Sequence, residues 1–306
     1  MDCGKEGAGE GNIRKKRGSC HGDTGFDMKA VAFAPGHITG FFEICTDDNN
    51  EVVGSRGAGV CISLGSYACA ERTDTSLTIH GNVGKGEVTR KALQMITGKG
   101  VSVMLKNELP VSQGFSVSAS SSLAATLSAA VVLGIPERKA LEATHAAELG
   151  ERTGLGDAVA SFTGGMEIRK QPGIEGEIEK VPSRKRLLIA VVDREIRTRD
   201  ILSSDAAIER INEVGRECLD TFMRNKSVEH LLDVSLDFSL RSGLADERMR
   251  RVLMEARRIG RISLCMLGRS LFAIYSREMK KFFSRYEHYE CVIDNEGARV
   301  LATLFP

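Results

Sequence analysis

The sequence predicts an α+β fold divided into two lobes. The chain has 306 residues, which suffices for one large domain or two modest ones. Up to residue 183, strand-like segments predominate and helices are inserted between them, whereas the rest of the chain is richer in amphipathic helices. We therefore expect an N-terminal lobe at residues 28–183 and an α+β C-terminal lobe at residues 184–306.

The composition is that of an ordinary globular protein, and it favours a small-molecule role over nucleic-acid or membrane binding. Hydrophobic residues make up 42% and charged residues 27%, and the formal net charge is +1. Such a balance gives no global electrostatic reason to bind nucleic acid or an anionic membrane. No apolar run approaches the ~20 residues that span a bilayer. The eight scattered cysteines, without a C-x-x-C pair, are typical of reduced thiols in a cytoplasmic protein.

Residues 1–27 are expected to be a disordered N-terminal extension. They are rich in glycine and charge, and they show neither helical nor strand periodicity. No apolar segment of a secretory signal is present among them. The basic run at 14–17 is compatible with a nucleic-acid contact or simply with a solvated tail, and we favour the tail.

The first folded elements are predicted strands at 29–34 and 60–70. Further strands are predicted at 76–80 and 100–106, with an amphipathic helix at 88–97 between them. The second strand is preceded by the glycine-rich segment 54–59, which we interpret as a loop. It is either a surface turn or a backbone held against a ligand, with Ser55 and Arg56 as donors to an anion.

The segment at 110–133 is predicted to be a loop that leads into a buried helix. Leu123, Leu127 and Val131 follow the spacing of one helical face, and small residues precede them. Free N–H groups and the helix dipole make such an N-terminus a binding site for phosphate. A serine-rich N-cap on an ordinary core helix is the alternative.

Two acidic residues follow on the next elements. A helix from residue 136 carries His145 and Glu148 at i and i+3, on one face. Asp157 comes after a glycine-bracketed turn and before a short helical run. In the functional interpretation, Asp157 is a carboxylate held beside the phosphate site. The structural alternatives are a helical histidine of the core and an N-capping aspartate.

The remaining elements complete the two lobes. On a strand at 166–169, Met166 and Ile168 should face one side, and Glu167 and Arg169 the other. The second lobe is predicted to contain a strand at 187–192, helices at 198–216, 228–241 and 246–258, two strands joined by a tight turn within 262–275, a helix from 276 and a last strand at 291–293.

Three motifs in this order resemble the GHMP kinase superfamily. They are Ala34-Pro35-Gly36, the segment from Pro110 to Ser122, and the turn from Met266 to Ser270. The middle one is similar to the family's P-x-x-x-G-L-G-S-S-A, whereas the P-loop and Rossmann glycine motifs are absent. Residues 34–42, 54–59, 110–115, 152–157 and 266–268 are similar to archaeal-type pantoate kinases. The resemblance implies a ribosomal-protein-S5-like N-terminal lobe and a ferredoxin-like C-terminal lobe.

The resemblance also implies the reaction, transfer of the ATP γ-phosphoryl group to the 4-hydroxyl of D-pantoate for coenzyme A synthesis. Mg²⁺ would be bound by Ser118, with Ser120 as alternative, and by Glu148. Asp157 would orient the hydroxyl and accept its proton. Ser116 departs from the family's glycine, and 118–121 from its G-S-S-A. The expected nucleotide-binding residues are Pro110, Gly114, Ser116, Ser118, Ala119, Ser120 and Ser121.

For the substrate, Arg169 is the expected partner of the pantoate carboxylate, because a guanidinium meets that group with two hydrogen bonds. The resemblance adds further substrate contacts, namely Ser55, His145, Thr198, Arg56 and His37. His37 stands where mevalonate kinases usually carry lysine. The alternatives are a related kinase for another hydroxy acid, such as shikimate or mevalonate, and a ligand sensor without catalysis. A homodimer is a further expectation.

Overall fold

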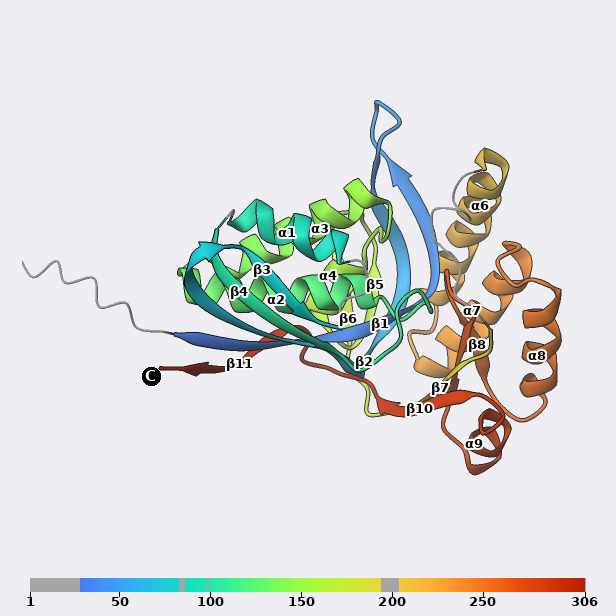
Figure 1. The fold of residues 1–306 in the computed structure, drawn as a ribbon. Coiled ribbons are helices and arrows are strands. Elements are labelled where there is room, and N and C mark those ends of the chain that lie inside the picture. Colours follow the sequence, from blue (N-terminus) through green and yellow to red (C-terminus); the bar gives the residue numbers. More distant parts are fainter. Residues whose placement is uncertain (1–27, 83–85, 98, 194–203, 306) are drawn as a thin grey trace, which may run out of the picture.

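Two β-sheets, one in each lobe, organise the chain (Figure 1). The computed structural model describes residues 28–82, 86–97, 99–193 and 204–305. The expected α+β architecture is confirmed within these ranges. The predicted N-terminal extension at 1–27 and Thr198 lie outside them.

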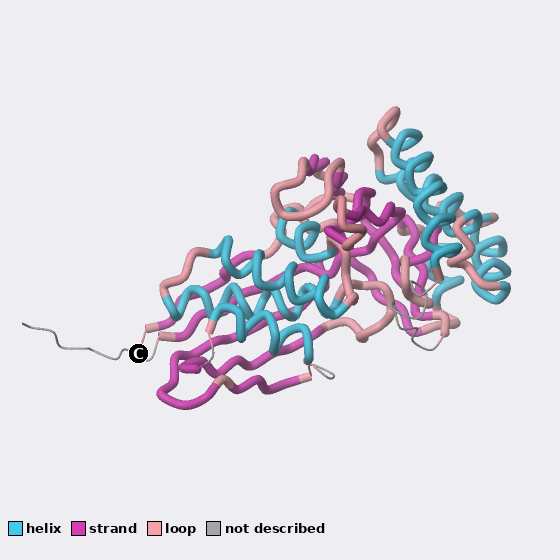
Figure 2. Tube along the Cα trace, turned by 90° about the horizontal axis from the view of Figure 1, so that it is seen from above, coloured by secondary structure: helices cyan, strands magenta, loops and turns pink. Residues whose placement is uncertain are grey.

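The first sheet has seven strands in the described part of the chain, and the four helices in its β3–β4 and β4–β5 connections cover one face (Figures 1 and 2). Its strands run in the order β11-β1-β2-β4-β3, with β5 paired to β2 and β6 paired to β5. All pairs are antiparallel except β3 with β4. The strands are β1 (Lys29–Thr46), β2 (Val52–Ser76), β3 (Thr78–Gly81), β4 (Lys99–Asn107), β5 (Met166–Arg169), β6 (Ile178–Val181) and β11 (Arg299–Leu304), and the helices are α1 (Glu87–Ile96), α2 (Val117–Leu133), α3 (Glu137–Glu151) and α4 (Asp157–Thr163).

Helix α2 is the centre of the first lobe. Alternation in β1 turns Ala30, Ala32 and Ala34 toward the helices, and all three are fully buried. Ala124 and Ala125 of α2 belong to the same buried cluster. Small side chains on both surfaces let helix and sheet approach closely, so α2 is buried on nearly every side rather than along one stripe.

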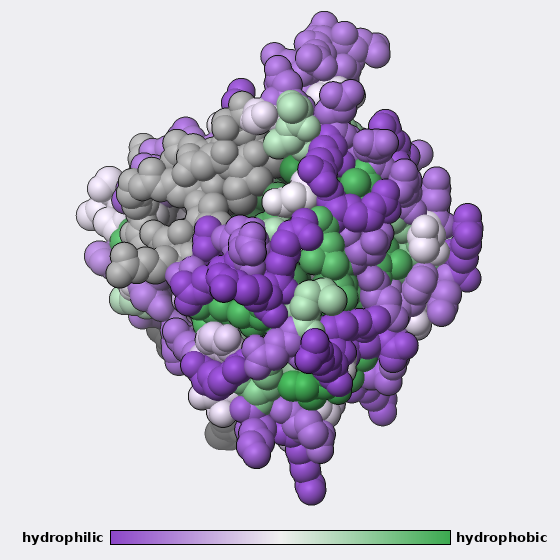
Figure 3. Space-filling view, turned by 90° about the vertical axis from the view of Figure 1, so that its right-hand side faces the viewer, coloured by the Kyte–Doolittle hydropathy of each residue, from purple (hydrophilic) through white to green (hydrophobic). Residues whose placement is uncertain are grey.

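The second sheet is antiparallel, in the order β10-β7-β9-β8; α7, α8 and α9 pack against it, and α6 packs against α7 and β1. The side of the molecule that carries α6 and α8 is largely hydrophilic, with hydrophobic residues in separate patches (Figure 3). The elements of this lobe are β7 (Arg186–Val191), α6 (Asp205–Phe222), α7 (Val228–Arg241), α8 (Glu247–Arg257), β8 (Ile262–Cys265), β9 (Ser270–Ile274), α9 (Arg277–Phe283) and β10 (Glu287–Val292).

Strand β1 joins the two lobes. Its first part lies under α2, and its second part packs against α6 and α7 of the other lobe. Phe41 contacts Phe222 edge-on with ring centroids 5.6 Å apart, and Phe42 contacts Phe238 at the same distance. Such edge-to-face pairs add to the burial of apolar area that holds the lobes together.

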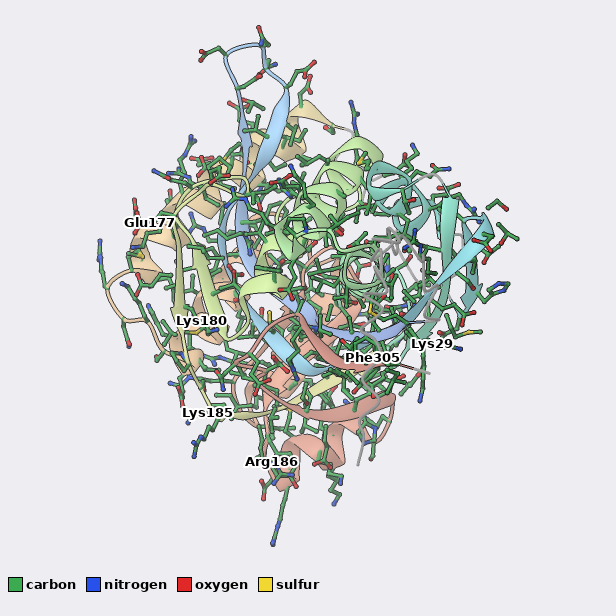
Figure 4. The ribbon with its side chains drawn as sticks, turned by 90° about the vertical axis from the view of Figure 1, so that its left-hand side faces the viewer. Lys29, Glu177, Lys180, Lys185, Arg186 and Phe305 are labelled. Carbon is green, nitrogen blue, oxygen red and sulfur yellow. The ribbon has the colours of Figure 1, made fainter. Side chains whose placement is uncertain are left out.

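The end of the chain differs from the prediction. The strand predicted at 291–293 overlaps the end of β10, and it is not the last one, because β11 follows it and pairs with β1. Lys29 is opposite Leu304, and Figure 4 shows Lys29 and Phe305 at the same end of the sheet. Most residues of β11 are half-exposed or exposed at this edge, so the strand lacks the apolar alternation that would have revealed it.

The predicted loop at 54–59 is wrong, because these residues lie inside β2. They pair with β1 over its far half, and Gly57 to Val60 also pair with β5 on the other side. Gly54 and Gly57 have φ of 142° and 146°, a backbone region that glycine adopts without strain. The glycines therefore mark irregular, crowded strand positions rather than a turn.

No helix in the described ranges is long and apolar enough to cross a membrane.

Gly215 of α6 is a test of how closely the lobes pack. A Cβ at this position would lie 2.2 Å from the Phe42 carbonyl oxygen, whereas one at Gly150 of α3 would meet nothing within 4 Å. Gly150→Ala should stabilise the protein by up to ~1 kcal/mol through helix propensity. Gly215→Ala should instead destabilise it by about 1–2 kcal/mol, because overpacking outweighs the same propensity gain.

Denaturant unfolding of both variants measures this difference. Two stabilised variants would contradict the close contact between α6 and β1.

Candidate active site

The loop before α2 is held in shape by the second lobe. Gly114 has φ 78°, and a Cβ there would lie 2.8 Å from the Cys265 carbonyl oxygen. A Cβ at Gly268 would lie 2.3 Å from the carbonyl carbon of Gln113. The loop therefore lies directly on the backbone of the β8–β9 turn, and both positions require glycine. Ser116, the N-cap of α2, is also left-handed, with φ 52°.

Gln113 was not singled out by its sequence context, yet it fastens this loop. Its side chain is buried; its Nε2 donates to the Asp193 carbonyl oxygen at 3.3 Å and its Oε1 accepts from Ser270 at 3.1 Å. Both partners belong to the second lobe. The loop is therefore positioned by contacts from outside its own lobe.

The serines of α2 point in different directions. Ser118 Oγ donates to Glu148 Oε1 at 3.3 Å. Ser120 is fully buried and bonds Ser66 of β2 at 2.8 Å. Ser121 donates to the Val117 carbonyl oxygen at 2.7 Å, inside the helix. Only Ser118 of these three is brought to a carboxylate.

Glu148 of α3 is fully buried beside the start of α4. Its Oε2 accepts from the Ala158 amide at 3.2 Å. A Cβ at Gly154 would lie 2.6 Å from Glu148 Oε1 and 3.0 Å from Asp157 Oδ2, so this glycine keeps the space between the two carboxylates open. Burial, together with the negative charge of Asp157, raises the pKa of Glu148 well above its usual range.

Asp157 is the first residue of α4 and touches β1. Its Oδ1 lies 2.9 Å from His37 Nδ1 and accepts from Thr39 at 3.3 Å. Burial opposes ionisation, but the hydrogen bond and charge of His37, with the charge of Arg169, outweigh it and lower the pKa of Asp157. The two neighbouring carboxyl groups, Glu148 and Asp157, are thus shifted in opposite directions.

His37 uses both ring nitrogens inside the protein. Its Nε2 lies 2.9 Å from Glu167 Oε1, while its Nδ1 faces Asp157. Burial favours the neutral ring, but hydrogen bonds to the two carboxylates outweigh it and raise the pKa of His37. Expected as a substrate contact, His37 is instead a link between β1, α4 and β5.

Arg169 and Ser55 converge on Gly156, immediately before Asp157. A Cβ at Gly156 would lie 2.8 Å from Arg169 Nε and 3.0 Å from Ser55 Oγ. Arg169 donates through Nη1 to Glu167, and its buried Nε has no hydrogen-bond partner within the described chain. As predicted, Met166 and Ile168 join the hydrophobic core while Glu167 and Arg169 face the other side.

The other expected substrate residues do not all meet here. Arg56 pairs with Glu43, its partner across the β1–β2 ladder, and so is committed elsewhere. His145 is 5% exposed, and its Nδ1 has no partner in the described part of the molecule. Burial lowers its pKa. A neutral, unpaired ring nitrogen is available to a ligand.

The donor set suits Mg²⁺ held together with a phosphorylated ligand. Within the described residues, no group of three or more His, Cys, Asp or Glu side chains could bind a metal ion by itself. One hydroxyl and one carboxylate, those of Ser118 and Glu148, stand together at the α2 N-terminus. Mg²⁺ is commonly bound by one or two carboxylates plus phosphate oxygens.

Comparison with known proteins finds similarity to kinases. Residues 85–165, which include α2, Glu148 and Asp157, match the model of the GHMP kinases N-terminal domain. The chain is 29% identical over 252 residues to the pantoate kinase of Methanocaldococcus jannaschii, covering 80% of this chain and 93% of the relative. It is 26% identical to the pantoate kinase of Thermococcus kodakarensis, covering 82% and 89%.

Solved structures share the whole fold. A phosphotransferase related to the coenzyme A biosynthesis pathway superposes with a TM-score of 0.78 at 24% identity, covering 90% of this chain and 98% of the other. Homoserine kinase from Cytophaga hutchinsonii superposes with a TM-score of 0.66 at 16% identity, covering 89% and 97%. The two-lobed GHMP kinase fold is thus confirmed, and the chain is similar to the archaeal pantoate kinases of the GHMP kinase superfamily.

Proposed function

We propose that the protein transfers the γ-phosphoryl group of ATP to the 4-hydroxyl of D-pantoate, giving 4-phosphopantoate for coenzyme A synthesis. The observation that carries the proposal is the meeting of Asp157, Arg169 and Ser55 around Gly156, near the Ser118–Glu148 pair. The Asp157 carboxylate would then face the pantoate hydroxyl, and the neighbouring Arg169 guanidinium would face the pantoate carboxylate. The pantoate kinases similar to this chain support the choice of substrate.

The nucleotide would bind along the loop 110–116 and the first turn of α2. The free N–H groups of that turn and the helix dipole favour phosphate oxygens. Ser118 and Glu148 would hold Mg²⁺, whose chemistry when bound is to neutralise charge on the transferring phosphoryl group. Ser120 and Ser121, which bond inside the protein, would shape this end of the helix rather than contact the ion.

Asp157 would position the pantoate hydroxyl. Its lowered pKa keeps it ionised, and an ionised carboxylate accepts the hydroxyl's hydrogen bond. In a loose phosphoryl-transfer transition state the hydroxyl loses its proton late, so orientation matters more than basicity. Asp157 would take the proton as the new P–O bond forms.

Arg169 and Ser55 would bind the pantoate carboxylate, and His145 would contact the substrate from α3. The unpaired Nε of Arg169 is the donor available for this carboxylate. We further propose a cytoplasmic location, to which the six free cysteines of the described residues are suited. A homodimer remains a prediction.

A substrate panel tests the proposal. With Mg²⁺ and ATP, D-pantoate should give ADP release well above that with shikimate or mevalonate. Measuring ADP by a coupled assay and 4-phosphopantoate by mass spectrometry identifies the reaction. Preferential turnover of another acid would reassign the substrate, and saturable pantoate binding without ADP would indicate a sensor.

Asp157→Asn tests the orienting carboxylate. The variant should lose about 10²–10⁴-fold in kcat, because the amide no longer accepts the hydroxyl proton. Binding of ATP, measured by calorimetry, should change far less than kcat, since the hydrogen bonds of Asp157 Oδ1 go to His37 and Thr39. A kcat near that of the unmodified protein would refute the assignment.

A matched pair of serine variants tests the metal ligand. Ser118→Ala should raise the Mg²⁺ concentration needed for half-maximal activity and leave the melting temperature nearly unchanged. Ser120→Ala should do the reverse, costing about 1 kcal/mol of stability because the buried Ser66 hydroxyl loses its partner. Mg²⁺ titrations and thermal melts of both variants separate the two roles, and the opposite pattern would make Ser120 the ligand.

A further inference from the structure

Glu167, in the middle of β5, is a buried carboxylate that none of the steps above uses. It is fully buried, its Oε1 accepts from both His37 and Arg169, and its Oε2 has no partner within the described residues. We propose that Glu167 is a positioning residue that fixes Asp157, through His37, and Arg169 relative to one another. This inference rests on the proposed function.

One oxygen atom of Glu167 connects the two halves of the substrate site. On one side the rigid imidazole of His37 spans 2.9 Å contacts to Glu167 and to Asp157. On the other side Arg169 bonds the same oxygen. The imidazole of His37 is rigid, and it shares the Glu167 oxygen with Arg169. A shift of Glu167 should therefore displace the Asp157 carboxylate and the Arg169 guanidinium together.

The backbone around Glu167 is shaped for this connection. Glu167 is opposite Gly59 across the β2–β5 ladder, and a Cβ at Gly59 would lie 2.3 Å from His37 Nε2. Because Gly59 has no side chain, His37 has room to contact Glu167. A larger residue at 59 would break the contact.

Stability alone does not account for a buried carboxylate at this position. Desolvation of such a group offsets most of the attraction to its partners, and apolar replacements of buried ion pairs are often neutral or stabilising. On the other face of the same strand, Met166 and Ile168 lie in the hydrophobic core. What the carboxylate supplies beyond packing is a fixed orientation of two cations.

Glu167→Gln keeps the side-chain shape but offers one acceptor atom and one donor group. With pantoate as substrate, the variant should show kcat reduced about 10–100-fold, as for outer partners of catalytic groups. Its pantoate KM should rise, because Arg169 loses its anchor, while the ATP KM should stay unchanged. Glu177→Gln is the matched control, since Glu177 is 61% exposed and lies at the surface (Figure 4).

A double variant separates positioning from general structural support. If Glu167 acts through Asp157, adding Glu167→Gln to Asp157→Asn should lower kcat little further, because the group being positioned is already lost. Fully multiplied losses in kcat would overturn the proposal. So would a Glu167→Gln variant that melts at a lower temperature but keeps the unmodified protein's kcat and pantoate KM.

NMR of histidine labelled with ¹⁵N gives a readout that needs no substrate. Both ring nitrogens of His37 face acceptors, so both should carry protons in the unmodified protein. In Glu167→Gln the Nε2 signal should move, and in Glu177→Gln it should not. If pantoate is not phosphorylated by the unmodified protein, the proposed function fails while this signal still reports the contact; an unmoved Nε2 signal overturns the inference itself.

Discussion

The close approach of β1 and β2 at two glycines is the constraint on which the rest of the structure depends. A Cβ at Gly57 would lie 2.2 Å from the Phe41 carbonyl oxygen, and one at Gly59 would lie 2.3 Å from His37 Nε2. Without these side chains β1 can turn His37 toward β5 and, a few residues on, place Phe41 and Phe42 against the second lobe. The hairpin thus sets both the site and the union of the lobes.

Charge compensation in this site is local and nearly complete. Asp157 and Glu167 face two cations, His37 and Arg169, so the low-dielectric interior holds no excess charge from these four groups. Within the described residues, Glu148 is hydrogen-bonded to Ser118 and to the Ala158 amide, and burial with the charge of Asp157 raises its pKa. The different surroundings of Glu148 and Asp157 fit the different roles proposed for them, binding of a metal ion and orientation of a hydroxyl.

The elements with strong periodicity could be predicted from the sequence, whereas contacts between distant segments could not. Helix α7 begins and ends where its apolar spacing indicates, and the alternation on β5 correctly separates Met166 from Arg169. The same alternation places Glu167 on the face of Arg169, and this was the sequence signal that could have indicated a role for Glu167. Its role depends on β1 and α4, residues far away in the chain, and no local pattern encodes that meeting. The glycines at 54–59 were wrongly interpreted as a loop for the same reason, since the strands that crowd them, β1 and β5, are distant in the sequence.

The departure of Ser116 from the family's glycine has a physical explanation. Ser116 has φ 52°, so the chain retains the left-handed conformation that glycine adopts freely, at a cost of roughly 1–2 kcal/mol. The conformation is kept because the loop is fixed from outside, by the β8–β9 turn on Gly114 and by the contacts of Gln113 to the second lobe. The loop's backbone is therefore determined more by its neighbours than by its own residues, and it keeps its left-handed turn although Ser116 departs from the motif.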